Sequence, residues 1–75
     1  KEPVTGIWAG DIVISPTEGD NIGHTGFYLN ATDIVSNSSL EPNLGKFIHN
    51  FTRTTWRNYY HYYKGLPVYI FRVLV

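Results

Sequence analysis

The apolar residues of this chain come in short runs, and stretches rich in turn-forming residues such as Gly, Pro, Asn and Asp separate several of them. Runs of this length are typical of β-strands, and β-branched and aromatic residues are the ones that strands favour. The segments between the runs are short and rich in turn-forming residues, as in connections between antiparallel neighbours. We therefore predict strands at residues 11–15, 24–30, 34–37, 46–51 and 67–74.

Residues 54–63 follow another pattern, because four aromatic side chains recur there at i, i+3, i+4 and i+7, the period of a helix. They are Trp56, Tyr59, Tyr60 and Tyr63. Thr54 and Thr55 are candidate N-caps, and Lys64–Gly65 is a suitable end. The predicted fold class is therefore mainly β: a small antiparallel sheet of about five strands with one short helix. The 75 residues are few enough for one small domain only.

Composition excludes several kinds of site. The chain has no Cys, so it has neither a disulfide nor a thiolate nucleophile of its own. Its three histidines, His24, His49 and His61, are too widely separated for a zinc cluster by spacing alone. We expect no metal and no cofactor. Nor does any apolar run reach the length of a membrane span, so none is expected.

The charges are unevenly distributed although the net charge is zero. All six acidic residues lie within residues 1–41, whereas every basic residue except Lys1 follows them. Such polarity would orient a polyanionic partner, or it would simply draw the two parts of one fold together. Zero net charge and the lack of a recognised motif argue against a nucleic-acid partner. Asp11, which opens a strand, is expected to cap a turn, and Arg72 to be solvent-facing or paired.

The candidate catalytic residue is His24, which opens a predicted strand within Gly23-His24-Thr25-Gly26. The two glycines would let a backbone or a substrate come close. Imidazole changes its protonation near neutral pH, so a histidine at such a place can act as a general base. The alternative is a half-buried histidine with an ordinary hydrogen bond.

The order of these segments resembles that of the NlpC-type, papain-like peptidoglycan hydrolases, and most of all the phage and prophage peptidoglycan amidohydrolases. The similarity lies in Gly-Asp-Ile-Val-Ile at residues 10–14, Gly-His-Thr-Gly-Phe-Tyr-Leu at residues 23–29, and the Tyr-containing end at residues 68–73. It spans roughly residues 10–73. The resemblance implies an α+β papain-like family in which a Cys attacks an amide, a His moves the proton, and a third polar residue orients the imidazole.

Carried over by position, His24 corresponds to the base of that family. The third residue, often a His twelve positions on, corresponds to Ser36, with Asn37 beside it. Either side chain can hydrogen-bond an imidazole but brings no charge, and an equal alternative is a polar pair near a turn. We also expect Gly23, Thr25, Gly26 and Trp56 to contact the substrate, since the glycines permit a close approach and the Trp56 ring can stack on a sugar.

The family's cysteine has no counterpart here. We therefore expect residues 1–75 to be the sheet half of a larger catalytic domain, inactive alone and completed by a Cys-bearing partner segment or chain. The substrate would be peptidoglycan, cleaved at an amide bond by an amidase or endopeptidase that is secreted or released to the bacterial cell wall.

A second hypothesis is a non-catalytic β module that binds wall glycan or a protein. The aromatic and basic residues 56–64 would supply stacking faces beside cations. Against it stands the interpretation that Trp56, Tyr59, Tyr60 and Tyr63 form one core face. Self-association through an open sheet edge is a further expectation.

Overall fold

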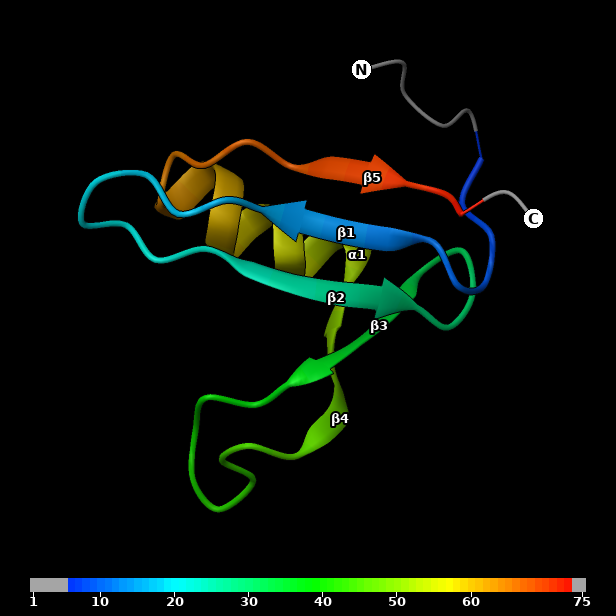
Figure 1. Ribbon diagram of the computed structural model, residues 1–75, viewed down its shortest axis with the longest axis horizontal. Coiled ribbons are helices and arrows are strands. Elements are labelled where there is room, and N and C mark those ends of the chain that lie inside the picture. The colour runs from blue at the N-terminus through cyan, green and yellow to red at the C-terminus, as the bar shows by residue number, and fades with distance from the viewer. Residues whose placement is uncertain (1–5, 74–75) are drawn as a thin grey trace.

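Five strands make up the sheet of this protein: β1 (Ile12–Ser15), β2 (His24–Tyr28), β3 (Asp33–Asn37), β4 (Phe47–Thr52) and β5 (Tyr69–Phe71). The computed structural model describes residues 6–73, and within them the strands lie in the order β4-β3-β2-β1-β5 with every pair antiparallel (Figure 1). The predicted shape, mainly β with about five antiparallel strands and one short helix, is confirmed.

Side chains explain where two of the strands begin and end. Asp11, predicted within the first strand, precedes it instead, because its Oδ2 accepts a hydrogen bond from the main-chain nitrogen of Trp8 at 2.8 Å and closes a turn. β5 has three residues of the eight predicted at 67–74. Leu74, the last of those eight, lies outside the described residues.

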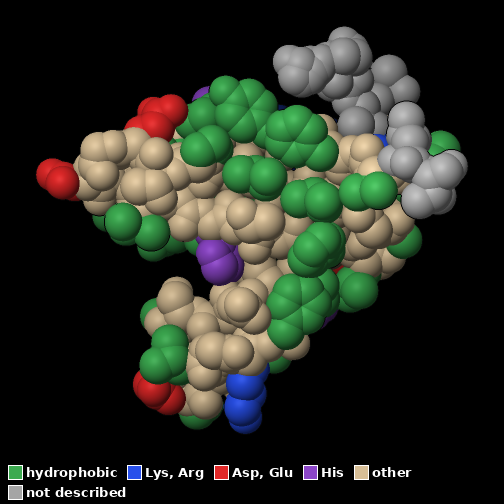
Figure 2. All heavy atoms as spheres, in the orientation of Figure 1, with side chains coloured by type: hydrophobic (Ala, Val, Ile, Leu, Met, Phe, Trp, Pro, Cys, Tyr) green, Lys and Arg blue, Asp and Glu red, His purple; other side chains and the backbone are tan. Residues whose placement is uncertain are grey.

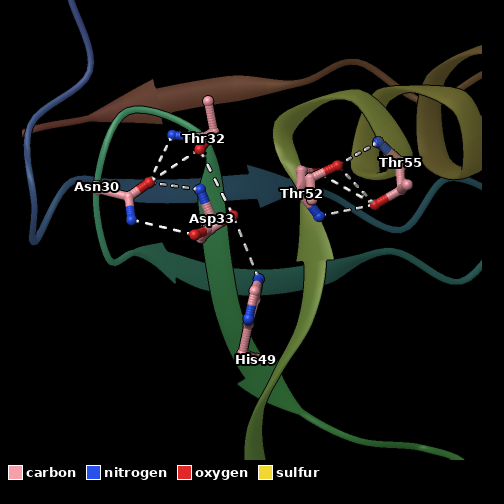
Figure 3. A network of polar contacts seen from close by, with 6 residues as sticks. All are labelled: Asn30, Thr32, Asp33, His49, Thr52 and Thr55. Atoms are coloured by element: carbon pink, nitrogen blue, oxygen red, sulfur yellow. Dashed lines mark hydrogen bonds and ion pairs between the residues drawn. The ribbon is translucent and has the colours of Figure 1, made fainter.

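The hairpin between β2 and β3 is closed by Asn30. Its Oδ1 accepts hydrogen bonds from the main-chain nitrogens of Thr32 and Asp33, both at 2.9 Å (Figure 3). These side-chain hydrogen bonds form in place of further pairing between the two strands, so β2 ends at Tyr28 and not at the predicted residue 30. Asp33 also reaches β4, where its Oδ1 lies 3.4 Å from Nε2 of His49.

The helical segment consists of α1 (Arg53–Trp56) and the π-helical η1 (Arg57–Tyr63). Thr52 is its N-cap: the main-chain nitrogen of Thr55 donates to Thr52 Oγ1 at 3.1 Å, and Thr55 Oγ1 accepts from the Thr52 nitrogen at 2.7 Å (Figure 3). The prediction of Thr54 and Thr55 as caps was therefore wrong, since Thr55 is the distal partner of a capping box that begins at Thr52. Gly65 ends the segment as predicted, with φ of 73°.

The helical segment lies across one face of the sheet, behind β1 and β2 in Figure 1. It leads from β4 at one edge to β5 at the other. Between the two layers lies the core, made of Val13, Tyr28, Ile34, Trp56, Tyr60 and Leu66. Trp56 is 1% exposed, and its Nε1 donates to Ser15 Oγ at 3.0 Å, which fixes the helical segment to β1.

Of the two alternatives predicted for Arg72, solvent-facing or paired, the structure has the paired one, and the partner is Asp11. Arg72 Nε donates to Asp11 Oδ1 and Arg72 Nη2 donates to Asp11 Oδ2, both at 2.8 Å. The guanidinium also lies 3.7 Å from the ring centroid of Trp8. Asp11 is buried, and the hydrogen bond from Arg72 outweighs burial and lowers the pKa of its carboxyl group. One ion pair thus ties the segment before β1 to the segment after β5.

Strands β2 and β3 pair over a short length only. The ladder between them consists of Phe27↔Val35 and Tyr28↔Ile34. At Gly26 the two strands come very close, because an added Cβ would lie 2.9 Å from both Ile34 Cγ2 and the Val35 carbonyl oxygen. Beyond this crossing β3 and β4 turn away from β2 (Figure 1). The edges of the sheet are β4 and β5, and self-association through them stays a prediction.

Ile34 provides a test of the core. It is 0% exposed, so Ile34→Val should lower the free energy of unfolding by about 1 kcal/mol, from the lost methylene and the cavity it leaves. Ile22→Val is the matched control, because Ile22 is 61% exposed and should leave stability unchanged. Urea denaturation of the three proteins measures both effects. Equal stability of all three would contradict the described core.

Asp11 provides a test with pH. Its pKa is lowered in the folded chain, so the contribution of its charge is complete above the unfolded-state pKa of about 4 and is lost as the pH falls through the lowered value. Asp11→Asn should therefore be less stable near neutrality and should lose less stability on acidification. Exposed Asp20→Asn, with the same change in charge, should keep the wild-type profile. Parallel profiles of wild type and Asp11→Asn would contradict this role.

Candidate functional site

His24 stands where β2 separates from β3. It is the first residue of β2 and pairs with Ser15 of β1, but no residue of β3 pairs with it in the sheet. Its ring bridges the opening instead: His24 Nε2 lies 2.9 Å from the main-chain carbonyl oxygen of Asn37, the last residue of β3. His24 is therefore held by a hydrogen bond to β3, although β2 and β3 are not paired in the sheet at this residue.

This contact assigns the proton of the neutral imidazole. A carbonyl oxygen can only accept, so Nε2 is the nitrogen that donates and carries the hydrogen. Nδ1 then bears a lone pair, and no residue within 6–73 makes a hydrogen bond to it. Nδ1 is the nitrogen that can take a proton from an incoming group.

Aromatic rings fix the plane of the imidazole. The His24 ring stacks on Trp56 with centroids 5.7 Å apart and planes at 19°, and on Tyr60 at 6.1 Å and 25°. Trp56 is itself anchored through Ser15. With the ring held on its face and at Nε2, the direction of Nδ1 is set by the core and not by solvent.

Two hollows meet at this histidine, and both are lined by His24 and Asn37. One, of about 500 Å³, continues along Ile14, Thr25 and the aromatic rings of Phe27 and Phe47. The other, of about 440 Å³, lies toward the helical segment. Figure 2 shows the molecule hollowed between the body of the sheet and the lobe formed by β3 and β4, with a histidine side chain in the hollow.

The second hollow combines apolar surface with polar side chains and carries no formal charge. None of the residues lining it has a carboxylate, ammonium or guanidinium group. Apart from His24, its polar side chains belong to Asn37, Ser38, Ser39, Asn50, Thr55, Tyr59 and Tyr60. Burial, followed by the neighbouring Tyr59, raises the pKa of Tyr60 to about 12, so this phenol remains a neutral donor at physiological pH.

The structure separates the two residues predicted to orient the imidazole. Asn37 contacts His24, but through its main-chain carbonyl and not through its side chain. Ser36 is fully buried and makes no hydrogen bond to His24, since its hydroxyl donates to Oδ1 of Asn50 at 2.8 Å. Within residues 6–73, the imidazole is hydrogen-bonded by a main-chain carbonyl and by neither of these two side chains.

The residues predicted to contact a substrate are placed differently from one another. Thr25 is exposed and lines the first hollow. Gly23 lines it too, but its missing Cβ makes room for the Ser15 carbonyl oxygen, which would lie 1.7 Å from that atom. Gly26 likewise makes room for β3. Trp56 and Tyr60 lie in the core, as the alternative interpretation predicted, so the Trp56 ring offers no face to a ligand. That interpretation was wrong for Tyr59 and Tyr63, which are exposed.

Asn50 is a residue of the candidate site that was not predicted from the sequence. It lies in β4, lines the second hollow beside His24 and accepts the hydrogen bond from Ser36. Ile48 and Asn50 alternate with the exposed residues Phe47 and His49 along this strand. A carboxamide at an inward-facing position of a strand is the signal that would have identified it.

Within residues 6–73, no three His, Asp or Glu side chains lie close enough together to hold a metal ion. None of the helices in that range has both the length and the apolar character needed to cross a membrane. No protein-family model, curated protein or solved structure matches this chain.

The histidines give opposite tautomers that can be measured. His24 donates from Nε2 to Asn37, whereas His61 donates from Nδ1 to the carbonyl oxygen of Leu66 at 2.8 Å. Above the pH at which both rings are neutral, long-range ¹H–¹⁵N spectra should show His24 protonated at Nε2 and His61 at Nδ1. The second ring is the internal control. An Nδ1-protonated His24 would remove the basis for its role as a base.

Proposed function

We propose that this chain is the His-bearing part of a bacterial cell-wall hydrolase of the Cys-His type, which cleaves an amide bond of peptidoglycan. The observation that supports it best is the state of His24: Nε2 lies 2.9 Å from the Asn37 carbonyl oxygen, no residue within 6–73 makes a hydrogen bond to Nδ1, and the residue lines both hollows. The sequence resemblance supplies the substrate class and the cysteine. The same proposal places the protein at the cell wall.

In this reaction a thiol from a second segment or chain gives its proton to His24 Nδ1, and the thiolate attacks the amide carbon. As the tetrahedral intermediate collapses, the imidazolium returns the proton to the leaving amine and a thioester remains. His24 then takes a proton from water, hydroxide attacks the thioester, and the thiol is restored with release of the acid. Throughout, Asn37 holds Nε2 so that proton transfer occurs at Nδ1 only.

The test is reconstitution. This chain, mixed with a Cys-bearing helical segment of the hydrolases that it resembles, should cleave purified peptidoglycan, measured as newly released amino groups. His24→Ala should reduce the rate by about 100-fold or more, because general acid–base catalysis typically contributes 10²–10⁴. His49→Ala, the matched control on exposed β4, should leave the rate unchanged. Restored cleavage that survives His24→Ala would refute the proposal.

A second function has a specific observation in its favour. Tyr62 and Tyr63 are 70% and 79% exposed, and Tyr63 stacks on Tyr59 with centroids 5.9 Å apart. Exposed tyrosine rings beside basic side chains suit a non-catalytic module that binds wall glycan or another protein. Tight binding of this chain alone to purified cell walls, unaffected by His24→Ala and lost in Tyr63→Ala, would favour that function over the hydrolase.

A further inference from the structure

The second hollow beside His24 has the chemistry of a site for an uncharged ligand. An ionic group entering it would lose water and meet no opposite charge, because its lining has no acidic or basic side chain other than the imidazole. The ammonium of Lys64 lies 5.0 Å from the ring centroid of Tyr59 and 5.4 Å from that of Tyr60. It does not line the hollow, and it donates to the carbonyl oxygen of Ile22 at 2.7 Å.

Asn50 gives the hollow a directed hydrogen-bond donor. Ser36 donates to Oδ1 of Asn50 at 2.8 Å, and Ser36 is buried and immobile within the sheet. With Oδ1 held in this way, the amide nitrogen Nδ2 is the free end of the carboxamide. No residue within 6–73 accepts a hydrogen bond from Nδ2, and Asn50 lines the hollow.

Other groups of the same hollow complement this donor. The phenol of Tyr60 remains a neutral hydroxyl, as described above, and Tyr59, 43% exposed, presents an aromatic ring. Aromatic rings with a few placed donors are the usual composition of a site for a neutral polar molecule. A ligand carbonyl oxygen that accepts from Asn50 would lie in the hollow that His24 also lines.

We propose that this hollow binds an uncharged carboxamide group, with Asn50 Nδ2 donating to its carbonyl oxygen and the Tyr59 ring contacting the rest of the ligand. The group is either a peptide amide or the acetamido group of a sugar. The inference rests on the proposed function in one respect, since the bound amide would be presented to His24. It adds a binding residue, Asn50, and a requirement that the ligand be neutral at this position.

Binding to the whole 75-residue chain tests this without any nucleophile. The probes are the trimer of N-acetylglucosamine and a capped neutral dipeptide, N-acetyl-L-alanine methylamide, each titrated while ¹H–¹⁵N spectra are recorded. Saturable shifts are expected at the Asn50 side-chain amide and at Tyr59. Asn50→Asp keeps an acceptor for Ser36 but replaces the donor by a carboxylate, so it should weaken binding at least about tenfold. Exposed Asn58→Asp, with the same charge change, should bind normally.

Each outcome decides the matter. Asn50-dependent binding of the sugar supports the acetamido source, and Asn50-dependent binding of the dipeptide supports the peptide source. No shift with either probe, or equal binding by Asn50→Asp, overturns the inference. If Asn50→Asp does not give a dispersed spectrum, Tyr59→Leu takes its place and should also weaken binding. If neither probe binds but cleavage still depends on His24, the inference fails and the proposed function stands. If a probe binds in an Asn50-dependent way but no cleavage is restored, the inference stands and the proposed function fails.

Discussion

The arrangement of this protein depends on the burial of one indole ring. Trp56 joins the helical segment to the sheet by its hydrogen bond to Ser15, and its ring packs against Phe51 and Tyr60 with centroids at 5.1 and 4.6 Å. The same ring supports the face of His24. Three of the six core residues within the described chain are aromatic, and side chains of this kind bring large apolar areas into a core. The residue that completes the core therefore also sets the orientation of the candidate base.

Local pattern predicted much of this fold, because local physics determines it. β-branched runs closed by turn residues gave the strands, and the aromatic spacing gave the helical segment. The N-cap was misplaced by two residues because the three threonines Thr52, Thr54 and Thr55 are equivalent in sequence, and only the capping box selects Thr52. No local sequence pattern predicts that β5 pairs with β1, because this pairing is decided by contacts between distant parts of the chain.

The candidate site was predicted in part, for a related reason. The glycines on either side of His24 predicted a close approach of other backbone. The structure shows two such approaches, that of β1 to Gly23 and that of β3 to Gly26. The imidazole, however, is held by a main-chain carbonyl, and every residue has one, so no choice of side chain reveals it. The two hollows arise from the divergence of β3 from β2, which is a property of the twisted sheet and not of any motif.

The position of β5 beside β1 also determines when β1 can pair on both of its sides during synthesis. During synthesis the first four strands leave the ribosome before β5 does, so β1 waits with an unpaired edge until almost the whole described chain has emerged. An unpaired edge is the part of a sheet most prone to pair with another chain. The first and last strands must then meet across the full contour of the fold, and such long-range pairing is slow. Nascent chains of this protein should accordingly be most prone to aggregate in the interval before β5 emerges and pairs with β1.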